Sequence, residues 1–257
     1  MEKKVLLKNI VVVIVAFAVY KLMGTFCASQ ISDNVVKLFA TEIVFVICSL
    51  CAAFFTNKLG EIKFSSKGFG KGFFVGLFVF VAAILRGIFW IVNYINGKET
   101  ITVSALAIVL FIISMLFVGI AEEMLFRGIL LNGFLDFFGE ITTKSLRMAI
   151  FFSSLVFGLL HIFNVTTGAT LVGAVMQAIN AIALGMVFGA IYVRSGKNIW
   201  SCIILHGFHD LASFINSGIL RGASTSDAIS GYDMSLLPSV LGMFLLALFL
   251  MRKKKLQ

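Results

Sequence analysis

Long uninterrupted runs of apolar residues dominate the chain, and short polar stretches separate them. A helix needs about 20 apolar residues to cross the hydrocarbon core of a bilayer. The pattern predicts about eight such segments, at residues 9–28, 35–56, 72–95, 102–134, 148–163, 170–193, 198–217 and 236–251. Strands of a transmembrane β-barrel alternate apolar and polar positions, which these runs do not. We therefore expect an all-α, polytopic membrane protein.

The fourth predicted segment, 102–134, is too long for one straight crossing. We expect it to be tilted, kinked or broken near Gly128 or Gly133. The first segment follows two lysines as a signal peptide would, but further spans follow it, so we interpret it as an anchor. Neither an internal repeat nor a boundary between domains is evident. The chain is therefore predicted to be one integral membrane domain, 1–257.

Composition narrows the class further. Hydrophobic residues make up 60% of the chain, charged residues only 13%, and the mean hydropathy is +1.06. These values exclude a disordered chain, a coiled coil and an ordinary soluble globule. The four cysteines lie in or beside apolar stretches, which argues against a disulfide framework. Cys48 and Cys51 form a C-x-x-C inside an apolar segment, where we expect packing rather than redox chemistry or metal binding.

The net charge of +9 indicates a membrane orientation rather than a nucleic-acid partner. Basic residues concentrate in loops that face the cytosol. With both termini in the cytosol, only Lys37, Lys98 and Arg221 lie on the opposite side. The cytosolic segments then hold 15 basic residues, namely Lys3, Lys4, Lys8, Lys58, Lys63, Lys67, Lys71, Lys144, Arg147, Arg194, Lys197, Arg252, Lys253, Lys254 and Lys255. We expect a multi-pass protein of the cytoplasmic membrane with both termini cytosolic.

An ionisable side chain inside a membrane span has a high free-energy cost, so each one is a candidate for a structural or functional role. The set comprises Lys21, Glu42, Arg86, Glu122, Glu123, Arg127, His161, His206, His209 and Asp210. An isolated member such as Glu42 suits a structural hydrogen bond or a position near the interface. A pair of adjacent carboxylates together with all three histidines indicates a functional site instead.

The first cluster reads AEEMLFRG, at 121–128. Glu123 and Arg127 are four residues apart, so they share a helix face and can form an ion pair. Glu122 is rotated by about 100° and can face a cavity. The arginine then offsets one carboxylate and leaves Glu122 free to act as a base. The alternative is a charged helix end near the lipid headgroups.

Two further clusters carry the histidines. In FGLLHIFN, at 157–164, His161 and Asn164 lie on one face. In LHGFHD, at 205–210, His206 shares a face with Asp210, which can orient its imidazole, and His209 lies three residues after His206. Core histidines or an interhelical knot of hydrogen bonds are the alternatives. Depths along the helices predict that the three clusters meet in one cavity open to the cytosol.

A glutamate and a histidine can together deprotonate water for attack on a carbonyl, and His206 can donate to the developing oxyanion. A serine, cysteine or threonine nucleophile beside a histidine is not evident. A catalytic zinc ion is the alternative to this metal-free mechanism, because histidine and carboxylate side chains bind zinc. The H-E-x-x-H motif of many zinc peptidases is absent, so no metal or other cofactor is expected.

The order Glu-Glu-x-x-x-Arg, Phe-x-x-x-His and His-x-x-x-Asp, each in its own apolar segment, resembles the CPBP (Abi) family. This family comprises CAAX proteases and bacteriocin-processing enzymes, which are intramembrane endopeptidases. The resemblance covers about residues 100–217, the expected catalytic core. It implies that Glu122 is the catalytic glutamate, that His161 helps it to activate water and that His206 helps to form the oxyanion hole.

The same resemblance implies that Glu123 and Arg127 hold the local structure. The family usually has asparagine at the position of Asp210, and an ionised aspartate cannot donate a hydrogen bond. Asp210 is therefore either protonated or a group that orients His206. The family is often labelled as metalloproteases, but a metal-free glutamate mechanism is implied here.

The expected function is cleavage of a membrane-associated peptide or protein precursor, with a peptide substrate and the bilayer as partners. A prenylated CAAX protein is one substrate that the resemblance allows. The alternative is a non-catalytic immunity or regulatory protein that binds a peptide in the same pocket. A proton-coupled carrier is a third reading, although carriers often show repeated halves, which this chain lacks.

Overall fold

The computed structural model describes residues 2–256 and contains only helices and loops within them. The longer helices are α1 (Glu2–Ser29), α2 (Asn34–Phe55), α4 (Leu77–Ile95), α5 (Ala105–Glu123), α7 (Thr143–His161), α8 (Leu171–Arg194), α9 (Ile199–Phe214) and α11 (Leu237–Leu250). Shorter helices are α3 (Phe69–Val75), α6 (Asn132–Phe138), α10 (Thr225–Ser230) and α12 (Lys253–Leu256). Within residues 2–256, three 3₁₀-helices and two π-helices complete the list. The 3₁₀-helices are η1 (Leu59–Ile62), η3 (Ile162–Thr167) and η5 (Met234–Leu236), and the π-helices are η2 (Met124–Leu131) and η4 (Ile215–Leu220). The predicted all-α class is confirmed.

Six helical stretches of the described chain are long and apolar enough to cross a membrane. They are Glu2–Ser29, Asn34–Phe55, Leu77–Ile95, Ala105–Phe138, Thr143–Thr167 and Leu171–Arg194. The two remaining predicted spans fold as the shorter helices α9 and α11, so the count of eight crossings stays a prediction. Many large apolar side chains of the outer helices are exposed, as on Leu85 and Ile95 of α4, at 62% and 73%. Lipid is the solvent that suits such faces.

The long fourth segment is continuous but irregular. Helices α5 and α6 are joined by η2, a π-helical stretch of eight residues that contains Gly128. Gly133 lies in the regular helix α6, so the expected irregularity occurs at the first of the two predicted positions. All eight residues of η2 are buried. A π-helical turn changes which residues share a face, and such turns are frequent at functional sites.

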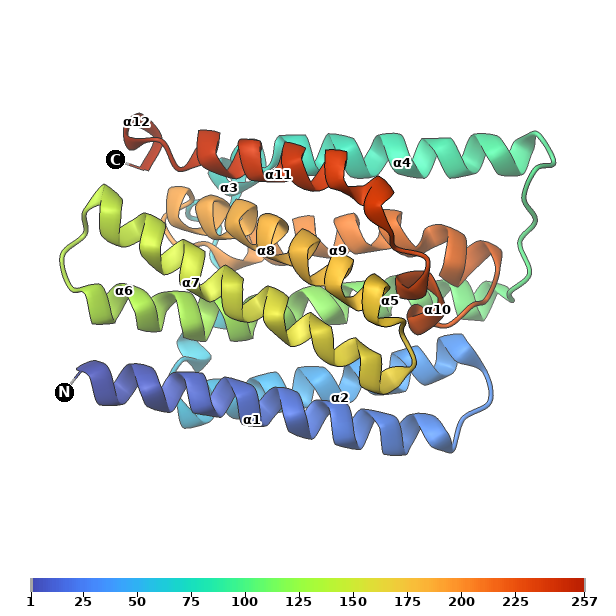
Figure 1. Ribbon diagram of the computed structural model, residues 1–257, viewed down its shortest axis with the longest axis horizontal. Coiled ribbons are helices and arrows are strands. Elements are labelled where there is room, and N and C mark those ends of the chain that lie inside the picture. The colour runs from blue at the N-terminus through green and yellow to red at the C-terminus, as the bar shows by residue number, and fades with distance from the viewer. Residues whose placement is uncertain (1, 257) are drawn as a thin grey trace.

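The helices form an elongated bundle in which both termini lie at the same end (Figure 1). The loops that join α2 to α3, α6 to α7 and α8 to α9 also lie at that end, which we call the terminal end. The opposite, distal end carries the α1–α2 and α4–α5 loops, η3 and α10. Helices α7 and α8, α1 and α2, α2 and α5, and α5 and α9 pack in pairs along the bundle.

Candidate active site

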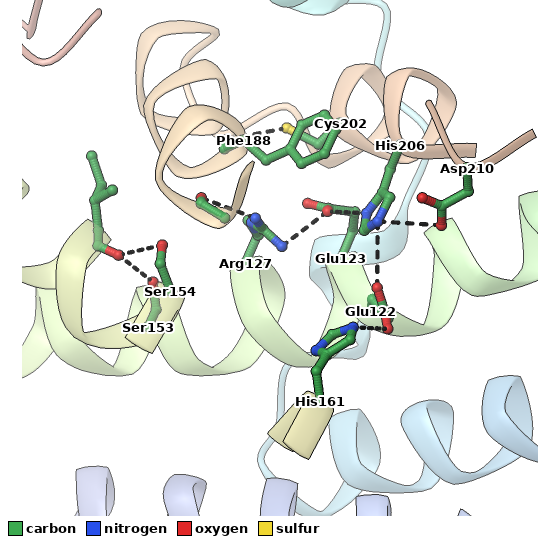
Figure 2. Close-up of polar contacts among 12 residues, drawn as sticks. Glu122, Glu123, Arg127, Ser153, Ser154, His161, Phe188, Cys202, His206 and Asp210 are labelled. Atoms are coloured by element: carbon green, nitrogen blue, oxygen red, sulfur yellow. Dashed lines mark hydrogen bonds and ion pairs between the residues drawn. The ribbon is translucent and has the colours of Figure 1, made fainter. Parts of the chain in front are cut away.

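Glu122 lies between two histidines that come from distant parts of the chain (Figure 2). Its Oε1 is 3.7 Å from Nε2 of His161, at the end of α7. Its Oε2 is 3.3 Å from Nε2 of His206, in the middle of α9. The structure therefore brings together the three residues that the sequence singled out as base, helper and oxyanion donor. The alternative of a charged helix end at the headgroups does not describe Glu122, which is 7% exposed and in the middle of the 105–138 helix.

Glu123 points away from Glu122 and joins a fully buried charged network (Figure 2). Its Oε1 lies 2.9 Å from Nη1 of Arg127, so the predicted ion pair is present. The same oxygen lies 2.7 Å from Nδ1 of His206. Arg127 also donates from Nη2 to the carbonyl oxygen of Gly185, at 3.0 Å. A buried pair that is tied on several sides holds its members in one geometry.

The guanidinium of Arg127 is enclosed by aromatic rings as well as by hydrogen-bond partners. It lies 5.3 Å from the ring centroid of Phe157 and 5.5 Å from that of Phe188. The ring of Phe188 also stacks on the imidazole of His206, with centroids 4.8 Å apart. Cation–π contact and stacking therefore position both His206 and the charge that supports it.

Carboxylates from two helices contact the ring of His206. Asp210, which the sequence left either protonated or orienting this ring, has its Oδ2 3.5 Å from Nε2, the nitrogen that faces Glu122. The short contact to Nδ1 comes from Glu123, on another helix. Intrahelical spacing alone could not identify this partner, because it depends on how α5 and α9 pack. Glu123 is thus the residue that fixes the His206 ring, and Asp210 adds a carboxylate beside Nε2.

His161 has its own fixed orientation. Its Nδ1 lies 2.9 Å from the carbonyl oxygen of Phe157, one turn earlier in α7. A carbonyl only accepts, so Nδ1 carries the hydrogen and Nε2 of the neutral ring is left with its lone pair. This lone pair faces Oε1 of Glu122 at 3.7 Å.

Two glycines allow α5 and α9 to approach closely enough for these contacts. A Cβ on Gly119 would lie 2.8 Å from the carbonyl oxygen of Ile203, and a Cβ on Gly207 would lie 3.3 Å from that of Met115. Gly119 precedes Glu122 by one turn, and Gly207 directly follows His206. Small residues at such a seam let membrane helices come together. The sequence analysis did not identify this pair.

A cavity of about 830 Å³ meets Glu122, His161 and His206. It runs to the distal end of the bundle, where Thr25, Thr167 and α10 contribute to its wall. The loops at 56–68, 139–142 and 195–198, at the terminal end, contribute no lining residue. The expectation of a cavity that opens on the same side as the termini is therefore wrong. The reason is packing: the eight residues of η2 that follow Glu123 are all buried, whereas the wall on the distal side of Glu122 is hollow.

Asn164 and His209 line the cavity, but neither forms a hydrogen bond or an ion pair with Glu122 in the described chain. Asn164 donates to Oε1 of Gln177 and accepts from Nζ of Lys21, both at 2.6 Å. The structure therefore places these two residues, which the sequence grouped with His161 and His206, in the wall of the cavity rather than against the carboxylate.

Three charged wall residues were noted as unusual in the sequence but given no place in the site. Lys21 of α1, Glu42 of α2 and Arg86 of α4 all line the cavity. Oε2 of Glu42 is buried without a hydrogen-bond partner, and Arg86 donates to Oγ of Ser213 at 2.8 Å. The signal that could have found them is a charge inside an apolar segment.

Zinc binding would need several free donor atoms grouped around one point. Within residues 2–256 no three histidine, cysteine, aspartate or glutamate side chains are grouped so that they could hold a metal ion. Nδ1 of His206 is occupied by Glu123, and Nδ1 of His161 by a backbone carbonyl. The remaining nitrogens both face the single carboxyl group of Glu122, at the distances given above.

Comparison with known protein families gives a match to part of the chain. The model of a family described as type II CAAX prenyl endopeptidase, Rce1-like, matches residues 104–212, about two fifths of the chain. No curated protein matches the chain. The matched range contains Glu122, Glu123, Arg127, His161 and His206. A membrane protease family implies a protease-like role, a peptide substrate and a bilayer. Through residues 104–212 the chain thus matches the Rce1-like CAAX endopeptidase family, and the recognition of a CAAX protease family from the three motifs is confirmed.

Proposed function

We propose that this protein is an intramembrane endopeptidase that hydrolyses a peptide bond of a membrane-associated peptide or protein precursor, with Glu122 as the base. One observation carries the proposal. A carboxylate in the middle of an apolar helix lies within 3.7 Å of His161 and 3.3 Å of His206, at the inner end of a cavity large enough for a peptide segment. The family match supports the reaction class.

The first step is activation of water. A water molecule that donates to Oε1 of Glu122 and to Nε2 of His161 has its oxygen lone pair directed toward a carbonyl carbon in the cavity. Glu122 takes one proton as the oxygen attacks. A positioned base of this kind contributes about 10²–10⁴-fold to the rate.

His206 then stabilises the tetrahedral intermediate. Carboxylate oxygens lie at both of its ring nitrogens, so the imidazole can carry both protons, and Nε2–H is the donor for the oxyanion. Glu123 and Arg127 hold the ring during this step. When the C–N bond breaks, the proton held by Glu122 passes to the leaving amine nitrogen, and the carboxylate is regenerated.

Two further parts of the proposal concern surroundings. We place the protein in the cytoplasmic membrane with both termini in the cytosol, because 15 basic residues lie at the terminal end. We also propose that no metal takes part, because the nitrogens that face Glu122 are both accounted for in the water and oxyanion steps. EDTA is expected to leave cleavage unchanged, and loss of cleavage that added Zn²⁺ restores would contradict this part.

The central experiment compares the secreted and membrane peptides of cells that carry the native protein or Glu122→Gln, by mass spectrometry. The amide keeps the size of the side chain but cannot take up a proton, so a product peptide should disappear and its precursor should accumulate. His161→Ala should give the same pattern. Glu140→Gln, at an exposed position of the terminal end, is the matched control and should cleave normally.

Cleavage that persists in both Glu122→Gln and His161→Ala would overturn the proposal. A biological effect that survives in these variants without any cleavage would show that binding of a peptide, rather than turnover, is the function. Immunodetection of the inserted protein at native levels ensures that lost cleavage reflects chemistry and not degradation.

A further inference from the structure

Among the described residues, the cavity is lined at the distal end of the bundle and by no loop of the terminal end, so we place its mouth at the distal end. Its outer wall is formed by Thr25 of α1, Asn34 of α2, Thr167 of η3 and Ser226 of α10, all at the distal end. Asn180 of α8 lies deeper in the same wall, nine residues beyond the start of that helix, or about 14 Å along it. A continuous passage lined by both polar and apolar side chains therefore runs from the distal surface toward Glu122.

The other side of Glu122 is closed. All eight residues of η2, from Met124 to Leu131, are buried, and Phe157 and Leu160 pack against them from α7. Arg127 fills the space between Phe157 and Phe188. Interiors packed in this way leave no room for water, so neither solvent nor a peptide reaches Glu122 from the terminal end.

The two ends differ sharply in charge. The distal segments carry three basic residues, Lys37, Lys98 and Arg221, beside four acidic ones. The acidic ones are Asp33, Glu99, Asp227 and Asp233. The terminal end carries the 15 basic residues given above. Because basic loops stay in the cytosol during insertion, the mouth of the cavity faces away from it.

We propose that the catalytic cavity is open to the non-cytosolic side of the membrane, so that the substrate is a peptide bond presented there by an exported or membrane-anchored chain. The identity of the occupant as a substrate rests on the proposed function. The side of access does not rest on the proposed function. It follows from the distal mouth of the cavity, from the packed residues of η2 on the other side of Glu122 and from the different charges of the two ends.

Thiol labelling in intact cells tests the side of access without any turnover. The full chain is expressed with Cys27, Cys48 and Cys51 replaced by alanine, while the fully buried Cys202 is kept as a silent residue. Single cysteines are then introduced by Thr167→Cys at the mouth, Asn180→Cys inside the cavity and Glu140→Cys at the terminal end. The probe is a membrane-impermeant methanethiosulfonate that carries a sulfonate group.

Before permeabilisation, Thr167→Cys and Asn180→Cys are expected to react and Glu140→Cys is not. After permeabilisation all three should react. Reaction of Glu140→Cys in intact cells would overturn the orientation. Failure of Asn180→Cys to react in intact cells would overturn access from the mouth.

The result is independent of the cleavage experiment. If labelling is as expected but Glu122→Gln cleaves normally, the proposed side of access stands and the proposed function is wrong. If labelling is the opposite but Glu122→Gln does not cleave, the proposed function stands and the proposed side of access is wrong. Cleavage in intact cells of an added peptide that cannot cross the membrane, once a substrate sequence is known from the comparison of peptides, should require the native Glu122.

Discussion

The two halves of the bundle, on either side of Glu122, differ in how their charged side chains are surrounded. On the terminal side of Glu122, charged groups are enclosed: Glu123 and Arg127 are 0% and 2% exposed and meet protein partners at 2.9 Å. On the distal side, charged groups such as Lys21, Glu42 and Arg86 line an open cavity. The packed half gives rigidity and the hollow half gives access to water. Glu122 lies at the boundary between the two halves. This position suits a catalytic base, because a base needs both a fixed orientation and access to water.

The largest effect is expected when the charge of Arg127 is removed from the packed half of the bundle. Arg127→Ala leaves Glu123 buried without its cation, and we expect the protein to lose about 3–5 kcal/mol of stability. Thermal unfolding in detergent measures this loss. Arg127→Ala combined with Glu123→Gln should regain part of the stability but not the activity, because Gln lacks the charge that holds His206. If Arg127→Ala alone unfolds at the same temperature as the native protein, the buried network of Glu123, Arg127 and His206 does not contribute to stability.

The seam between α5 and α9 is the next most sensitive feature. Gly119→Ala places a methyl group 2.8 Å from the carbonyl oxygen of Ile203, so the two helices must separate. Because a displacement of about 1 Å at a catalytic site costs about 10²-fold, we expect kcat to fall by about that factor. Gly87→Ala is the matched control, since nothing lies within 4 Å of its new Cβ. Equal rates in the two variants would show that the close approach does not matter for catalysis.

The smallest effect is expected in the wall of the hollow half. His209 lines the cavity but has no hydrogen bond or ion pair with Glu122, so His209→Ala should change cleavage by less than about tenfold, mainly through KM. His206→Ala, three residues earlier, should reduce kcat by about 10²–10³-fold, because it removes the oxyanion donor. Steady-state kinetics on one peptide separates the two. Equal losses in kcat would place His209 in the chemistry as well.

The sequence revealed more about the site than about its surroundings. Glu122, His161 and His206 could be selected because ionisable groups are rare in apolar segments and because their spacing fixes which helix face they share. The ion pair between Glu123 and Arg127 follows from a separation of four residues within one helix. Contacts between helices carry no such local signal. For that reason Glu123 was not identified as a partner of His206, whereas Asp210, four residues later in the same helix, was considered as one.

The all-α class, the main apolar helices and the three motifs follow from the sequence by itself, because hydrophobic length and helical periodicity are local properties of the chain. The tertiary structure decided the rest: the close seam at Gly119 and Gly207, the capture of His206 by Glu123 and the end at which the cavity opens. These depend on which helices pack together and at what depth. Glu122 and His206, for example, are 84 positions apart in the sequence and meet only after the bundle has formed.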